Sequence, residues 1–217
     1  MKNIDENYFK NDKMQNNKIE DLINDGEQLL WRGKPKKSAF ILSSIFSMLP
    51  LALIWLIFDG GFIATLFIFG EELPVYAIII LSLFFIIHLT PVWIWLANVV
   101  SANRKHKNIE YAFTNERIII RSGVIGIDII NIYYNDITSV SLKVSWIDKL
   151  LKVGDIYISS KSHSQVLYDI TDPYFITNKL QKIVNDIKND IEFPNELRPE
   201  VNKGFKTQYE NDIINKK

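Results

Sequence analysis

Two long apolar stretches constrain what this chain of 217 residues can fold into. The first runs for 20 residues without a charge, from Ala39 to Phe58, and the second runs for 26 residues, from Val75 to Val100. Because roughly 20 apolar residues cover the ~30 Å hydrocarbon core of a bilayer, each stretch is long enough to cross it. We therefore expect a two-helix transmembrane hairpin over residues 38–100.

The charges around these stretches predict an orientation. The basic residues lie on the outer flanks of the pair: Lys34, Lys36, Lys37, Arg104, Lys105 and Lys107. Between the stretches the charged residues are Asp59, Glu71 and Glu72. Basic flanks stay in the cytoplasm. We therefore expect a multi-pass protein of the cell membrane with both termini cytoplasmic.

The outer end of the first helix is less well defined. Asp59-Gly60-Gly61 is typical of a turn, but the outer end of the first helix is defined only to within a turn or two. The segment from Phe62 to Phe69 is apolar but too short to span a bilayer. It is expected to extend the first helix, to lie in the outer interface or to pack on the hairpin.

Composition narrows the classes of function. The formal net charge is zero, which gives no argument for nucleic acid binding. The absence of cysteine excludes disulfides and thiolate chemistry. The isolated histidines His106 and His163 show no metal-ligand spacing, and no phosphate loop, nucleophile elbow or paired-carboxylate motif is present. We expect no cofactor, no metal and no enzymatic activity.

The rest of the chain divides into three parts. Residues 1–37 are expected to form a cytoplasmic tail and juxtamembrane segment, and residues 193–217 a disordered tail. Between them, residues 109–192 show about six strand-like segments, in which Ile137 to Val144 alternates clearly between apolar and polar residues. A helix then begins at Pro173 and carries one apolar stripe, formed by Ile176, Leu180, Ile183, Ile187 and Ile191. This predicts an α+β domain in which the helix packs on antiparallel strands.

Several segments of this chain resemble a known family. They are the hairpin from Tyr111 to Gly123, the phrases Ile137 to Leu142 and Gly154 to Ile158, and the upstream motif Glu27 to Pro35. Together they resemble the bacterial pleckstrin-homology-like membrane proteins of the bPH2 or DUF304 family. The resemblance covers roughly residues 27–191 and implies a seven-strand, strongly bent sheet or partial β-barrel closed by the C-terminal helix. A seventh strand is expected within Trp146 to Val153 or split from another strand, although Trp146 to Leu151 also fits a short helix.

The candidate ligand or partner contacts of the domain are basic. Arg117 and Arg121 alternate to the same face of one strand, and Lys143, Lys149 and Lys152 form a second possible patch. Against a ligand role stands the simpler interpretation of a solvated face with cross-strand ion pairs. Residues 109–192 contain nine basic and eleven acidic residues, which disfavours strong attraction to anionic lipid.

Three residues of the apolar region also stand out. Trp31 precedes the first stretch and is expected to anchor the chain at the membrane interface. His88 lies in the second stretch, where an imidazole bonding the neighbouring helix is the expected packing device. Pro91 frees a carbonyl upstream that polar groups can satisfy.

These observations favour a non-enzymatic binding or scaffold module, held on the cytoplasmic face by its helices and serving protein–protein contact or self-association. One alternative is a module that senses lipid headgroups. Another is an accessory subunit of a membrane enzyme or transporter. Pleckstrin-homology folds host lipid binding, peptide binding and oligomerisation, so the fold alone does not choose among them.

Overall fold

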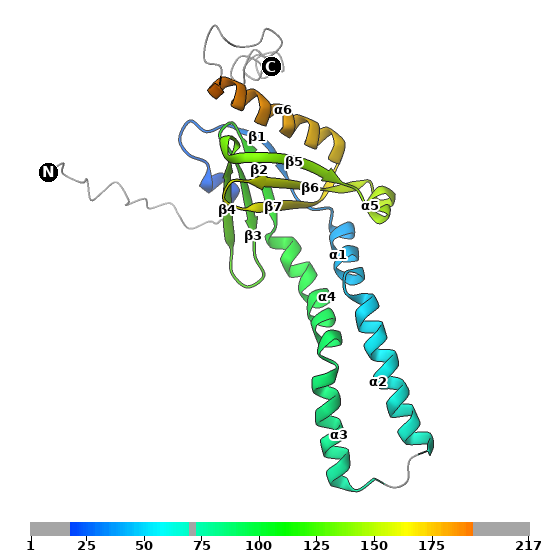
Figure 1. Ribbon diagram of the computed structural model, residues 1–217. Helices are drawn as coiled ribbons and strands as arrows, with labels where there is room; N and C mark the ends of the chain where they lie inside the picture. Colours follow the sequence, from blue (N-terminus) through cyan, green and yellow to red (C-terminus); the bar gives the residue numbers. More distant parts are fainter. Residues whose placement is uncertain (1–17, 70–72, 193–217) are drawn as a thin grey trace, which may run out of the picture.

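The two apolar stretches form two helical arms that lie side by side and lead into a domain of strands (Figure 1). This is a computed structural model, and it describes residues 18–69 and 73–192. The predicted tails at residues 1–17 and 193–217 lie outside the described residues. The first arm consists of α1 (Lys37–Phe46) and α2 (Leu49–Phe69), and the second of α3 (Val75–His88) and α4 (Thr90–Asn108).

The first arm has a break between α1 and α2, just before Pro50, the second residue of α2. Proline lacks an N–H and its ring crowds the carbonyl four residues upstream, which ends α1 at Phe46. The indole of Trp95 in α4 donates to the carbonyl of Ile45 at 2.8 Å and so satisfies a backbone group beside this break. Residues 37–68 together form a helix that is long and apolar enough to cross a membrane.

The expected turn at Asp59 was wrong, because α2 continues as a helix to Phe69. Asp-Gly-Gly forms turns where water satisfies the backbone, whereas in apolar surroundings the helix is the conformation that bonds every N–H and C=O internally. Of the three alternatives for Phe62 to Phe69, extension of the first helix is the one observed.

The second arm is sharply bent. The axes of α3 and α4 meet at 52°. The two helices are long and apolar enough to cross a membrane only if they are treated as a single bent helix. The cause is Pro91, which leaves upstream carbonyls without helical partners. The hydroxyl of Thr90 donates to the Ile87 carbonyl, and the indole of Trp93 donates to the Ile86 carbonyl at 3.0 Å. Of the predicted pair of spans, one arm is thus a candidate span by length and composition, and the second is not a single straight helix long enough to cross.

The domain contains two antiparallel sheets, which confirms the predicted α+β class. The first sheet has the order β1-β2-β3-β4 and the second the order β5-β6-β7. Their bounds are β1 (Leu29–Gly33), β2 (Glu110–Thr114), β3 (Arg117–Ser122), β4 (Asp128–Tyr133), β5 (Ile137–Lys143), β6 (Val153–Ser160) and β7 (Ser164–Thr171). In the described residues the sheets do not close into a barrel.

The seventh strand is β1, and it comes from the segment expected to be juxtamembrane. It pairs antiparallel with β2, with Trp31 opposite Phe113 and Gly33 opposite Tyr111. The expected location within Trp146 to Val153 was wrong, since those residues form the short helix α5 (Trp146–Leu151) followed by the start of β6. A 3₁₀ helix, Ile19–Leu22, precedes β1 and packs Ile19 against Ile119 of β3.

The last helix, α6 (Pro173–Glu192), lies across β5 and β6 at the end of the domain away from the arms (Figure 1). Its predicted stripe is buried at Ile176, Leu180 and Ile183, where it meets Ile156 and Ile158 in the main core. The stripe ends before the helix does, because Ile191 is exposed.

The domain is fastened directly to the arms. The backbone N–H of Lys36 donates to the Asp169 carbonyl at 2.9 Å, and the Lys36 ammonium donates to the Leu151 carbonyl at 2.8 Å. On the other arm, Nε2 of His106 lies 2.8 Å from the Pro35 carbonyl. Since α4 continues as a helix to Asn108 and β2 begins at Glu110, no flexible linker separates the arm from the sheet.

Candidate functional site

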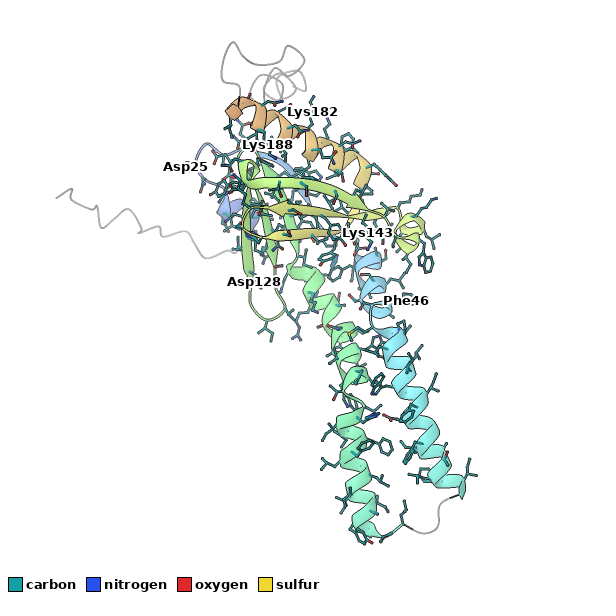
Figure 2. The ribbon with its side chains drawn as sticks, in the orientation of Figure 1. Asp25, Phe46, Asp128, Lys143, Lys182 and Lys188 are labelled. Atoms are coloured by element: carbon teal, nitrogen blue, oxygen red, sulfur yellow. The ribbon has the colours of Figure 1, made fainter. Side chains whose placement is uncertain are left out.

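A polar pocket lies where the arms meet the domain, and we call it the junction pocket. Its volume is about 460 Å³, which is within the range of small-molecule sites. It is lined from α1 and α4 by Phe40, Ser43, Ser44, Ser47, Asn98 and Lys105, and from the domain by Lys143, Ser145, Asp148, Asp155, Tyr168 and Asp169. Figure 2 shows Lys143 on the side of the domain next to the start of α1.

The helical wall of the pocket is polar because Ser43, Ser44 and Ser47 interrupt the otherwise apolar sequence at the start of the first arm. Ser43 and Ser44 donate their hydroxyls to the Phe40 carbonyl, and Ser47 donates to the Ser44 carbonyl. With their protons used inside the helix, these hydroxyls retain lone pairs that can accept hydrogen bonds.

The domain wall depends on a bulge in β7. The register between β6 and β7 shifts between Gly154 and Ile156, opposite Tyr168 and Asp169. Asp169 has a positive φ of 51°, and the displaced N–H of Tyr168 donates to the Tyr111 hydroxyl at 3.1 Å. Bulges change the direction of side chains and occur often beside functional sites. Here the bulge puts the Asp169 carboxylate into the pocket wall.

Asp169 is unusual in its surroundings. Only 3% of the residue is exposed, yet among the described residues no donor contacts its carboxylate. Burial, followed by the charges of Asp155 and Asp148, raises the pKa of Asp169 to about 7. Burial also raises the pKa of Asp155, although the N–H of Asp169 donates to its Oδ1 at 2.9 Å. This wall of the pocket therefore favours a positively charged group.

Two lysines, Lys105 and Lys143, also line the pocket. Lys105 donates to the Asn98 side chain at 3.3 Å, and Lys143 pairs with Asp155 in the register of β5 and β6. Of the three lysines predicted as a patch, Lys143 is the one that lines the pocket. Lys149 lies in α5, and Lys152 follows it in the left-handed conformation, so neither forms part of the pocket wall.

Arg117, a predicted contact residue, is occupied inside the protein. Its Nε and Nη2 donate to the two carboxylate oxygens of Glu27 at 3.0 and 2.9 Å, and both residues are buried. Burial opposes ionisation of Glu27, but hydrogen bonds from Arg117, Thr114 and the Asn24 N–H outweigh it and lower the pKa of Glu27. The pair ties the segment before β1 to β3.

Arg121 lies beside a second acid. Its Nη1 is 3.9 Å from Glu110, a buried residue that also forms an ion pair with Arg32 of β1. Arg121 therefore forms one of the cross-strand ion pairs considered at the sequence level, whereas Arg117 pairs with Glu27, which precedes β1. The face that carries them is covered by the segment around β1 rather than solvated.

Trp31 is partly buried and packs against the domain core. Its ring packs on Phe113 with centroids 4.5 Å apart and covers Gly33, where a side chain would collide with the indole. Glycine at position 33 is thus required by this close approach. The structure thus gives Trp31 a packing contact, and its expected role as an interfacial anchor stays a prediction.

His88 bonds the neighbouring helix, and its partner is the carboxylate of Asp59. His88 Nδ1 lies 2.9 and 3.1 Å from the two Asp59 oxygens, and three aromatic rings surround the imidazole: Trp55, Phe58 and Phe84. The sequence pattern assigned Asp59 to a turn, whereas the continuous helix α2 places its carboxylate opposite His88. The carbonyls upstream of Pro91 accept hydrogen bonds from the side chains of Thr90 and Trp93 rather than from His88.

The pocket carboxylates were not predicted. Asp148, Asp155 and Asp169 lie on three different elements, α5, β6 and β7. Gly154-Asp155 and Asp169 are visible in the sequence as acidic residues of neighbouring strand segments. The bulge that brings Asp155 and Asp169 together has no sequence signature of its own.

Comparison with known protein families gives one match that bears on this fold. The family described as Bacterial PH domain matches residues 43–189, which include α2 to α4, β2 to β7 and most of α6. Among solved structures, a DUF1696 family protein with a pleckstrin-homology domain from Shewanella loihica PV-4 is 20% identical. That similarity covers 37% of this chain and 70% of that chain, with a TM-score of 0.28. A search of curated proteins finds no match.

The class of protein defined here is a pleckstrin-homology-like α+β domain continuous with a pair of apolar helices. Because the family match extends over more than half of the sequence, the chain belongs to the bacterial PH domain family.

Proposed function

We propose that this protein is a membrane-anchored, non-catalytic binding module. Both arms cross the membrane, and the domain lies on the cytoplasmic face. The one long apolar helix and the bent apolar pair support two crossings, and the basic flanks at the domain end support the orientation. PH-like folds commonly serve binding, which agrees with the absence of a catalytic motif in the sequence.

The partner in this proposal is a protein in the same membrane, either a second copy or another chain. The observation that carries it is the free edge of β4, which among the described strands has a hydrogen-bonded neighbour on one side only. Its outward side chains Ile129 and Tyr133 are exposed and apolar, and Ile125 in the preceding loop is 98% exposed. Exposed edge strands with apolar side chains are templates for strand addition.

The position of β4 restricts the partner. In Figure 1 the loop between β3 and β4 points along α4 toward the apolar helices. A domain fixed to its arms without a linker keeps this edge at a constant height above the bilayer. Such tethering raises the effective concentration of partners that lie in the same membrane.

Orientation is tested by labelling single cysteines, which the natural chain lacks. We expect a membrane-impermeant maleimide to label cysteine in Glu72→Cys from outside intact cells and to leave Ser162→Cys unlabelled. Labelling of Ser162→Cys alone would show that the domain lies outside.

Partner binding is tested by photo-crosslinking in cells, with a benzophenone amino acid at Ile129 and, as control, at exposed Ser162. We expect a discrete protein adduct from position 129, weakened by Tyr133→Lys, and none from position 162. Tagged and untagged copies expressed together identify self-association. If position 129 gave adducts to lipid and none to protein, the proposed protein partner would be contradicted and lipid-headgroup binding would be favoured.

A further inference from the structure

The junction pocket carries both signs of charge in separate parts of its wall. Asp169, Asp155 and Asp148 come from β7, β6 and α5, whereas Lys105 comes from α4 and Lys143 from the end of β5. A ligand of one sign leaves the opposite wall without a partner, and desolvating unpaired charge is costly. The chemistry therefore fits a zwitterion.

The anionic part of the wall contains one carboxylate with no partner. Asp148 is used in the N-terminal cap of α5, where its Oδ2 accepts from the Ser145 N–H at 2.8 Å. Asp155 accepts from the Asp169 N–H. The buried carboxylate of Asp169 has no donor among the described residues, although it lines open space. A primary ammonium group supplies several N–H donors together with the missing positive charge.

The cationic part of the wall fits a phosphate. Lys105 and Lys143 are flexible ammonium donors, and within residues 18–69 and 73–192 the one hydrogen bond of the Lys105 ammonium is the long contact to Asn98. The hydroxyls of Ser43 and Ser44 in α1 and of Ser47, which follows it, donate to carbonyls of α1, so phosphate recognition falls to the lysines.

The place of the pocket in the fold points to the source of such a ligand. The pocket lies immediately above Leu49, where the 21 residues of α2 begin. At about 1.5 Å per residue this helix is roughly 30 Å long, which matches the hydrocarbon core. The pocket is then at the level of the lipid headgroups.

We infer that the junction pocket binds a phosphoammonium zwitterion, with its primary ammonium at Asp169 and Asp155 and its phosphate at Lys105 and Lys143. The headgroup of phosphatidylethanolamine has this chemistry, and so does free phosphoethanolamine. This site is separate from the β4 edge, so either can fail without the other.

The test uses the purified full chain in detergent micelles that contain equal amounts of phosphatidylethanolamine, phosphatidylcholine and phosphatidylglycerol. Native mass spectrometry measures the lipid retained on the protein. We expect phosphatidylethanolamine to be retained over phosphatidylcholine, whose quaternary ammonium has no N–H, and over phosphatidylglycerol, which has no ammonium.

Variants assign the preference to the pocket. Asp169→Asn and Lys143→Gln should each lower retention of phosphatidylethanolamine about tenfold, as expected for a lost hydrogen bond to a charged group. Asp128→Asn is the matched control, because Asp128 lies at the start of β4, on the other side of the domain from Lys143 (Figure 2). Circular dichroism verifies that each variant folds, and Asp155→Asn replaces Asp169→Asn if the latter does not.

Competition separates the two sources. Displacement of the lipid by millimolar phosphoethanolamine would assign the site to the free compound, and resistance to it would assign the site to the lipid. Equal retention of the three lipids together with no binding of phosphoethanolamine would overturn the inference. So would an Asp169→Asn variant that retains phosphatidylethanolamine as well as Asp128→Asn does.

Discussion

Asp59 and His88 face each other across the two helical arms, with His88 Nδ1 2.9 Å from one oxygen of a carboxylate that is only 2% exposed. His88 is also the last residue of α3, immediately before the 52° bend. The contact therefore joins the first arm to the second at the point where the second changes direction. In the proposed topology both residues lie within the bilayer, where a polar group without a partner is costly.

A double-mutant cycle should reveal this coupling. Asp59→Leu and His88→Leu are each expected to destabilise the full chain, since each leaves its partner buried and unpaired. The double variant should be less destabilised than the sum, by about 1–2 kcal/mol. Unfolding in detergent micelles provides the measurement. A cycle of Asp59→Leu with Ser82→Ala is the control, because Ser82 bonds only its own helix, and it should be additive. Additivity in the His88 cycle as well would show that the hydrogen bond contributes nothing.

The buried pair of Glu27 and Arg117 should be important for holding the segment before β1. Arg117→Met leaves the Glu27 carboxylate without its two strongest donors, and breaking a buried pair costs about 3–5 kcal/mol. We expect a corresponding loss in the free energy of unfolding, together with faster hydrogen exchange in residues 29–33. Lys161→Met is the control, because Lys161 and Asp136 form an exposed pair at 3.9 Å, worth less than about 1 kcal/mol. Equal effects of the two substitutions would contradict the structural role of Arg117.

Asp169 should make stability depend on pH. Its pKa is raised from 3.8 to about 7 in the folded protein, so the folded state binds the proton more tightly than the unfolded state. Its contribution to stability is fully present below about pH 4 and is lost as the pH rises through 7. The shift corresponds to at most about 4 kcal/mol, and solvent in the pocket reduces this to on the order of 1–2 kcal/mol.

Replacing Asp169 by asparagine removes this titration. We expect Asp169→Asn to unfold at a higher temperature than the natural protein at pH 8 and at a similar temperature at pH 4. The comparison is made in detergent without added phospholipid, because a bound ammonium would favour the ionised carboxylate. A difference between the two proteins that is the same at both pH values would exclude Asp169 as the titrating group.

The sequence predicted those parts of the fold in which one residue pattern determines the structure. The alternation around Val140 and Leu142 and the stripe through Leu180 and Ile183 depend on burial against the domain's own core, and both are observed. The two arms were located because apolar length alone defines them.

The parts that were missed depend on long-range contacts. The segment Leu29–Gly33 becomes a strand because it pairs with the edge of β2, which begins 81 residues later in the chain. There the ring centroids of Trp31 and Phe113 are 4.5 Å apart. Carboxylates far apart in the sequence, Asp155 and Asp169, meet because of a bulge. Asp59 remains helical because its surroundings are apolar and His88 is opposite. None of these conditions is local, so local patterns did not contain them.

The last prediction concerns α6, which should belong to the cooperative fold of the domain. Ile183 is 4% exposed and packs in the main core, whereas Ile191, two turns further along the same helix, is 60% exposed. Ile183→Asp places a charge in the core without a partner and should cost several kcal/mol in the free energy of unfolding of the full chain. Ile191→Asp makes the same chemical change on an exposed site and should alter stability by less than about 0.5 kcal/mol. Denaturant unfolding followed by circular dichroism measures both. If the two variants unfold at the same denaturant concentration, α6 does not contribute its stripe to the core.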